Sequence, residues 1–181
     1  MFAGTLKAFR EVEQSLGLVF PDTYKRAVKA YGLGLWQDFW CITSPFSENA
    51  PNHPLPWYIP RYGITSGPDH CTRLREVEKD FPGEYPWPIY PAPGGLFPWA
   101  LTDSGGVLYW LTAGDPDGWP TIYDPHDRPE NWERYDLPFA ELLFKTLTRE
   151  CELFRGELRE DFEDGCSDAF RPWARWRPES M

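Results

Sequence analysis

Hydrophobic residues near the start of the chain recur at the spacing of amphipathic helices. The first series precedes Gly17 and comprises Phe2, Leu6, Phe9, Val12 and Leu16. The second follows Pro21, a residue suited to the first turn of a helix, and comprises Tyr24, Val28 and Tyr31. The two stripes predict two successive helices, which end near Gly17 and at Gly32.

The middle of the chain alternates between apolar runs and turn residues, which is typical of strands joined by hairpins. We expect one strand at 35–42, then four more and a short edge strand, at 87–90, 96–102, 107–111, 119–123 and 131–135. The link Asp103-Ser104-Gly105-Gly106 between two of them supplies residues that tolerate positive φ. Such a link predicts a hairpin and therefore antiparallel pairing.

Two further helices are expected around these strands. The first opens with a capping box from Ser66 to Asp69, and its apolar stripe is Leu74, Val77 and Phe81. His70 falls in its first turn, where we expect a position at the surface or rim. The second is predicted to be capped by Asp136 and to hold Pro138 in its first turn. Its stripe comprises Phe139, Leu143, Leu147, Cys151 and Phe154.

This order of elements predicts an α+β fold. It would have N-terminal helices, a central twisted antiparallel sheet joined by hairpins, and a C-terminal helix packed on the sheet. A chain of 181 residues, of which 41% are hydrophobic, suffices for one domain with a sizeable core. We place that domain at residues 1–155, with a proline-rich insert at about 45–68. Residues 156–181, acidic and then rich in Arg and Trp, form a C-terminal extension.

The excess of acidic over basic residues indicates which kinds of molecule this chain can bind. Acidic residues number 28 against 18 basic ones, for a net charge of −10. Such a surface repels phosphate backbones and anionic headgroups, so we expect no direct partner in nucleic acid or in a membrane. A basic protein is the partner that it suits. Because the start of the chain is charged and has no signal-peptide apolar region, a cytoplasmic location is expected.

Residues suited to catalysis or metal binding are sparse. The four cysteines lack CxxC spacing, which predicts reduced thiols rather than a metal site; they are Cys41, Cys71, Cys151 and Cys166. The histidines form no pair at ligand spacing, and Ser104 lacks the GxSxG pattern of a nucleophile elbow. We therefore expect no metal, no cofactor and no catalytic residue. A hydrolase that uses loop carboxylates stays open as an alternative.

The aromatic residues fall into two groups. Those in predicted strands are expected to pack in the sheet; they are Trp99, Trp110 and Trp119. Those in or beside proline-rich loops are expected to be more exposed; they are Trp57, Tyr58 and Trp87.

Exposed aromatics beside acids would suit the interface with a basic protein. Acids and aromatics coincide in two places, and these give the candidate partner-binding residues. The first set is Glu48, Trp57 and Tyr58, and the second is Asp115 and Asp117, close to Trp119 and Tyr123. The alternative for the second set is that the two aspartates only shape a turn while Trp119 lies in the core.

An ordered set of segments resembles a known superfamily. It runs from FPDTYK at 20–25 and YGLG at 31–34, through YPAPGGLFPWA at 90–100 and TDSGG at 102–106, to LYWL at 108–111. It continues with DPD at 115–117, WP at 119–120 and the segments 132–135 and 138–143. In this order the segments resemble the SUKH superfamily, which takes in the Smi/Knr cell-wall-synthesis regulators and many bacterial toxin-immunity proteins. The match covers about residues 1–155 and departs in the insert and the extension.

This resemblance implies a fold and a function. It implies an α+β fold without catalytic residues or cofactor, used as a protein-binding module that often neutralises a nuclease or another toxin. The matching residues would be structural: Pro21, Tyr24, Gly94, Gly95, Leu96, Pro98, Trp99, Asp103, Gly105, Gly106, Trp110, Trp119 and Pro120. We therefore expect an immunity protein that binds a cognate toxin domain. A regulatory or scaffolding protein of the same fold, with a host-cell partner, is the alternative.

Overall fold

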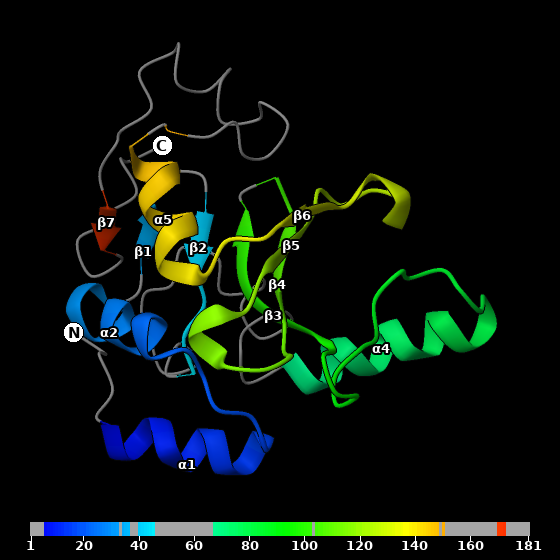
Figure 1. Cartoon of the computed structure of the whole chain (residues 1–181), viewed down its shortest axis with the longest axis horizontal. Helices are drawn as coiled ribbons and strands as arrows, with labels where there is room; N and C mark the ends of the chain where they lie inside the picture. The colour runs from blue at the N-terminus through cyan, green and yellow to red at the C-terminus, as the bar shows by residue number, and fades with distance from the viewer. Residues whose placement is uncertain are drawn as a thin grey trace, which may run out of the picture.

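The structure, a computed structural model, describes residues 6–32, 34–36, 40–45, 67–102, 104–148, 150 and 170–172. Within these residues the fold is α+β, with helices before and after an antiparallel sheet (Figure 1). The predicted fold class is thus confirmed. No described helix combines the length and the apolar character that crossing a membrane requires.

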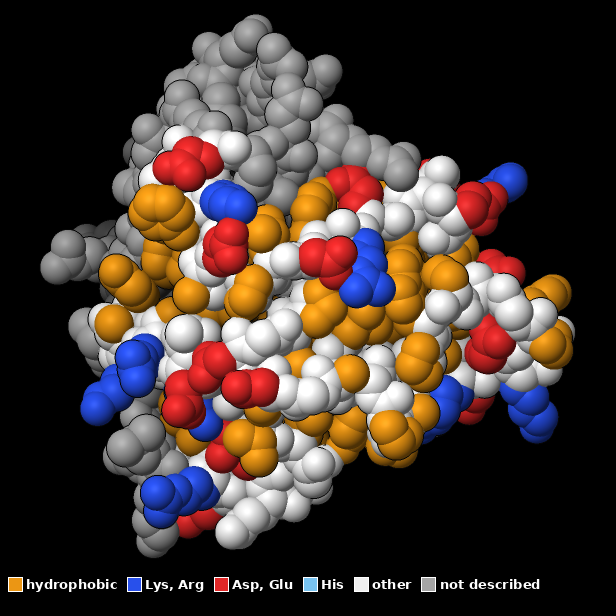
Figure 2. All heavy atoms as spheres, viewed as in Figure 1, with side chains coloured by type: hydrophobic (Ala, Val, Ile, Leu, Met, Phe, Trp, Pro, Cys, Tyr) orange, Lys and Arg blue, Asp and Glu red, His pale blue; other side chains and the backbone are white. Residues whose placement is uncertain are grey.

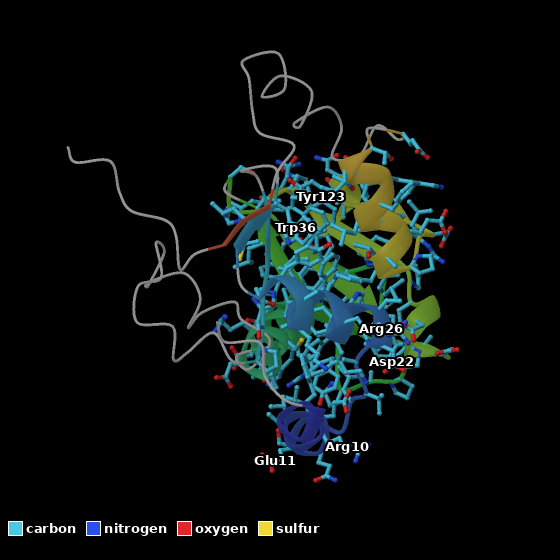
Figure 3. All side chains as sticks on the ribbon, turned by 90° about the vertical axis from the view of Figure 1, so that its left-hand side faces the viewer. Arg10, Glu11, Asp22, Arg26, Trp36 and Tyr123 are labelled. Atoms are coloured by element: carbon cyan, nitrogen blue, oxygen red, sulfur yellow. The ribbon has the colours of Figure 1, made fainter. Side chains whose placement is uncertain are left out.

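The two N-terminal helices lie where the apolar stripes predict them. Helix α1 covers Leu6–Leu16 and helix α2 covers Asp22–Tyr31. One carboxylate joins them, because Glu13 Oε1 accepts from the backbone N–H of Phe20 at 2.9 Å and from Lys25 Nζ at 3.0 Å. The labelled Arg10 and Glu11 lie on the outer side of α1 (Figure 3). The side of α1 that meets the core carries the buried Phe9 and the partly buried Val12 and Leu16, opposite the charged outer side.

The sheet has seven described strands in the order β6-β5-β4-β3-β2-β1-β7, and all neighbours are antiparallel. The strands are β1 Gly34–Trp36, β2 Trp40–Ile42, β3 Leu96–Thr102, β4 Val107–Leu111, β5 Thr121–Asp124, β6 Glu133–Tyr135 and β7 Phe170–Pro172. Strands β3 and β4 have the predicted bounds. Gly105 in their connection has φ +97°, which confirms the predicted use of positive φ in this turn.

The remaining helices complete two layers around the sheet. They are α4 (Gly67–Asp80), α5 (Phe139–Leu147) and the short 3₁₀ helices η3 (Pro116–Gly118) and η4 (Pro129–Asn131). Trp110 contacts Tyr24 of α2 at 5.1 Å between ring centroids, whereas its strand neighbour Tyr109 contacts His70 of α4 at 5.6 Å. Successive strand residues face opposite sides, so α2 and α4 cover opposite faces of the sheet. Figure 3 shows α5 on the side of α2.

The predicted strand tryptophans lie in the core. Trp99 and Trp110 stack with their ring centroids 5.5 Å apart and their planes 8° apart, and Trp119 packs against Trp110. All three are buried. The ring of Tyr24 packs against Trp110, and its hydroxyl donates to the carbonyl of Thr43 at 2.7 Å. A continuous aromatic core therefore joins α2 to the centre of the sheet.

Two of the predicted strands are wrong. The segment 35–42 forms the two short strands β1 and β2, which pair with each other, rather than a single strand. The segment 87–90 makes one isolated bridge, from Ile89 to Leu96, and no strand. Both segments are rich in aromatics, and strand propensity does not distinguish a half-buried strand from a loop that packs its rings on the core. Strand β5 starts at Thr121, two residues later than predicted.

The predicted cap of the last helix is also wrong. Helix α5 follows Pro138 without any side-chain cap, and Asp136 instead pairs with Arg134, whose Nη2 lies 2.7 Å from Asp136 Oδ1. A neighbouring cation thus outcompetes the helix N-terminus for this carboxylate. The helix buries Phe139, Leu142 and Thr146. Ser66 of the predicted capping box lies outside the described residues, as do Cys151 and Phe154 of the predicted stripe.

Candidate functional site

The predicted partner-binding residues divide between described and undescribed parts of the chain. Glu48, Trp57 and Tyr58 of the insert lie outside the described residues. Asp115 and Asp117 flank and enter η3, in the connection between β4 and β5. The aromatic residues near them, Trp119 and Tyr123, are both buried in the core and offer no ring to a partner. The alternative that placed Trp119 in the core is therefore confirmed.

Both aspartates have structural contacts. Asp117 Oδ1 accepts from the backbone N–H of Thr23 at 3.0 Å and from the Thr23 hydroxyl at 2.8 Å, at the start of α2. Burial raises the pKa of Asp117, but the hydrogen bonds from Thr23 and from the N–H of Asp22, together with the charge of Lys25, lower it by more, so the pKa lies below its usual value. Asp115 Oδ1 accepts from the backbone N–H of Asp117 at 3.2 Å. A role in partner binding stays a prediction, and for Asp117 it would compete with this helix contact.

Replacing Asp117 with alanine should lower the free energy of unfolding by about 1–2 kcal/mol, as for the loss of a helix N-cap. The reason is that the N–H of Thr23 loses its acceptor in a partly buried place. Urea unfolding followed by tryptophan fluorescence measures the change. Asp115→Ala is the matched control, and it should stay within about 0.5 kcal/mol because its contact is exposed. Equal losses in the two variants would contradict the role given to Asp117.

A second group of aromatics lies beside acids, and it extends from a buried ring to two that are only partly covered. We call Tyr85, Trp87 and Trp132 the aromatic cluster. Trp132 stacks on Tyr109 of β4 at 5.5 Å between centroids, on the face of the sheet that α4 covers. Trp87 stacks on Trp132 at 6.3 Å and Tyr85 contacts it at 5.4 Å. Tyr85 and Trp87 are half-buried, so the cluster extends from the core to the surface.

Local hydrogen bonds hold the two segments that carry the cluster. On the segment after α4, Glu78 accepts from the backbone N–H groups of Gly83 at 2.7 Å and Tyr85 at 3.0 Å. On the β5–β6 connection, residues 125–132, Asp124 Oδ1 accepts from the N–H of His126 at 2.7 Å. Trp132 Nε1 donates to the carbonyl of Asp127 at 3.1 Å. A carboxylate of the preceding element thus accepts backbone N–H groups of each segment, Glu78 of α4 for one and Asp124 of β5 for the other. These hydrogen bonds hold the backbone that carries the rings.

The electrostatic environment of the cluster is negative. Burial raises the pKa of the Tyr85 hydroxyl, and the charges of Glu84, Asp124 and Glu78 raise it further. The charged groups that act on this pKa are all carboxylates. Burial also raises the pKa of Asp124 to about 6, so this carboxyl is largely ionised at neutral pH. An aromatic surface in a negative field attracts cationic groups, both by simple charge and through the faces of the rings.

No protein-family model, curated protein or solved structure matches the chain.

The surface position predicted for His70 is wrong. His70 is buried, and its Nε2 lies 2.8 Å from the Tyr109 hydroxyl. Burial, with a smaller contribution from the charge of Arg73, lowers the pKa of His70 to about 4. The imidazole is therefore neutral at physiological pH and serves as a polar contact between α4 and the sheet beneath the aromatic cluster.

This burial predicts a pH dependence of stability. Because the folded pKa lies below the unfolded value of about 6.5, neutral His70 stabilises the fold above that value, and the stabilisation is lost as the pH falls towards about 4. His70→Gln lacks the titration. The difference in free energy of unfolding between wild type and variant should thus shrink by about 2–3 kcal/mol between about pH 7 and about pH 4. The raised pKa of Asp124 makes its contribution to stability increase as the pH falls through this range. This contribution is the same in wild type and variant, so it cancels in the difference. A difference that stays constant with pH would contradict a buried neutral imidazole.

The described thiols and acids do not form a reactive group. Cys41 and Cys71 are free and buried, and burial raises the pKa of both thiols, that of Cys71 to about 12. They are therefore protonated and poor nucleophiles at neutral pH. Within the described part of the chain, no three side chains of the metal-ligating types gather as a site for an ion. The arrangement of the described residues is suited to binding through rings and charge.

Sequence reasoning named only part of the cluster. It singled out Trp87 as an aromatic outside the sheet, but it placed Trp132 only in a strand or motif and did not single out Tyr85. The available signal was composition: Glu84 precedes Tyr85, and Glu130 and Glu133 flank Trp132. What the sequence could not supply is the stacking of Trp87 on Trp132, which are far apart along the chain.

Proposed function

We propose that this chain is a non-catalytic protein-binding module that binds and neutralises a basic toxin domain, in the manner of the SUKH immunity proteins that its sequence resembles. The observation that carries the proposal is the aromatic cluster in its field of carboxylates. In such an interface the acids speed the association with a basic partner, and the partly desolvated rings provide affinity. The net charge of −10 acts in the same direction over the whole molecule.

The conformation of the cluster supports binding to a protein surface. Its rings stack on the core through Tyr109 and its backbone is held by Glu78 and Asp124, so little side-chain entropy remains to be lost on binding. Tyr and Trp are the residue types most often found at the energetic centre of protein interfaces. A rigid ring surface of this kind favours a macromolecular partner with exposed Lys or Arg side chains.

Co-expression with the product of the neighbouring gene tests the function. We expect a basic protein that is toxic when expressed alone, that loses toxicity with this chain and that purifies with it as a complex. A non-toxic partner that forms the complex would favour the regulatory or scaffolding alternative. A toxic neighbour that neither binds nor is neutralised would overturn the proposal.

A further inference from the structure

The apolar stripe of α4 extends beyond the sheet that covers its first half. The stripe comprises His70, Leu74 and Val77 of α4 and Phe81, the residue directly after the helix, and their exposed fractions rise along the chain from 7% and 9% to 38% and 64%. Figure 1 shows α4 running away from the sheet in this direction. We call Val77 and Phe81 the outer α4 face. It continues a stripe whose other half is buried, so the same side of the helix changes from core to surface.

Charge is unevenly distributed around the outer α4 face. With about 100° of turn per residue, Glu78 and Asp80 lie on either side of the stripe and Lys79 lies opposite it. Phe81 is the more exposed member of the pair, and the acids therefore border the ring that a partner would reach first. Arg73, four residues before Val77, lies on the Asp80 side, so a partner that covers this face meets apolar atoms in the middle, carboxylates on both sides and one guanidinium beside Val77.

The outer α4 face adjoins the aromatic cluster. Glu78, which borders the face, accepts from the N–H of Tyr85, a member of the cluster. Towards the sheet, His70 of the stripe contacts Tyr109, on which Trp132 stacks. Figure 2 shows hydrophobic side chains gathered between the β5–β6 connection and α4, with acidic and basic side chains beside them. The face and the cluster thus adjoin as apolar and aromatic groups, and the carboxylates at their border, Glu78, Asp80 and Glu84 among them, outnumber Arg73.

The charge of this surface decides between the possible occupants. A second copy would bring the same carboxylates, Glu84 and Asp124 among them, against those of the first, at a net charge of −10 for each chain. A segment that places cations opposite Glu84 and Asp124 is attracted electrostatically to this surface, whereas a second copy is repelled by it. The surface therefore fits a partner segment that is apolar on one side and basic on the other.

We propose that the outer α4 face and the aromatic cluster together dock an amphipathic basic segment of the partner. Its apolar side chains cover Val77 and Phe81, and an Arg or Lys lies over Tyr85 and Trp87 with Glu84 and Asp124 within reach of its charge. The inference rests on the proposed function, whose partner chemistry and binding surface it names.

Two labelled peptides test the docking site in the full-length protein. One is a helical peptide with leucines along one side and arginines along the other, and the second has glutamates in place of the arginines. Fluorescence anisotropy should show that the arginine peptide binds, more weakly at high salt, and that the glutamate peptide does not. Phe81→Ser should weaken binding about tenfold, as for an aromatic anchor at the centre of an interface. Glu84→Gln with Asp124→Asn should weaken it and reduce the salt dependence.

Phe144→Ser is the matched control, because Phe144 is also an exposed phenylalanine, at 56%, but lies on α5. It should bind the arginine peptide as the wild type does, and thermal melting should show that both serine variants are folded. The docking site is overturned if the arginine peptide does not bind, if Phe81→Ser binds it normally, or if Phe144→Ser weakens binding as much. A dimer that Phe81→Ser dissociates would overturn it in favour of a second copy. Since no toxin is present, these results decide the docking site, and co-expression decides the function.

Discussion

Replacing Gly95 with alanine is expected to lower the free energy of unfolding by about 3 kcal/mol, at the upper end of the usual cost of overpacking. An added Cβ would lie 2.4 Å from the backbone nitrogen of Tyr90, 2.6 Å from the carbonyl carbon of Ile89 and 2.7 Å from the carbonyl oxygen of Ala92. All three are backbone atoms in a closed turn, so no side chain can move aside. The change would also disturb the segment that leads from the aromatic cluster into β3.

Urea unfolding and thermal melting measure this effect. For a chain of this length, a loss of about 3 kcal/mol corresponds to a fall in melting temperature of about 6–12 °C. Gly118→Ala is the control, because an added Cβ there meets no atom within 4 Å. We expect that variant to melt close to the wild type. If Gly95→Ala and Gly118→Ala were equally stable, the close approach at Gly95 would be wrong.

Replacing Trp132 with alanine is expected to cost about 3 kcal/mol of stability, as for other large-to-small changes of buried aromatics. The variant loses the ring that stacks on Tyr109 and that supports Tyr85 and Trp87. Binding of a basic partner should weaken as well, because the remaining rings would no longer be held in one arrangement.

Trp132→Phe distinguishes the contribution of ring stacking from that of the indole hydrogen bond. It keeps an aromatic ring for stacking but loses the bond from Nε1 to the carbonyl of Asp127, which should cost about 1 kcal/mol. Partner affinity should then stay closer to the wild type than in Trp132→Ala. Chemical unfolding measures the stabilities, and titration calorimetry measures the affinities. Two variants with the same affinity as the wild type would show that Trp132 does not support the binding surface.

The elements that the sequence predicts best are those whose signals are local. Strands β3 and β4 have the predicted bounds because each is an apolar run that ends at turn residues, and Gly105 supplies the positive φ that the turn requires. Helices α1 and α2 follow from the spacing of their apolar residues. In these cases the residues that decide the structure are neighbours along the chain.

The failures involve partners that are distant in the sequence. The buried His70 contacts Tyr109, 39 residues away, and Asp117 meets Thr23, 94 residues away. Nothing near His70 in the chain distinguishes a buried imidazole from an exposed one. The aromatic cluster has the same origin, since Trp87 and Trp132 meet only after the sheet has brought the segment after α4 beside the β5–β6 connection. Composition can suggest that such rings matter, but the tertiary contacts decide which of them share a surface.

Hydroxyl-radical footprinting of the complex with the basic partner recovered by co-expression tests the central claim most directly. Radical labelling measures how accessible each side chain is, and mass spectrometry reads it residue by residue in the free and bound chain. We predict that the partner protects Phe81, Tyr85 and Trp87, while Phe144 on α5 and Val19 before α2, both exposed in the free chain, are labelled equally in both states. Protection of Phe144 or Val19 with Phe81 and Trp87 unchanged would place the interface elsewhere and contradict the account.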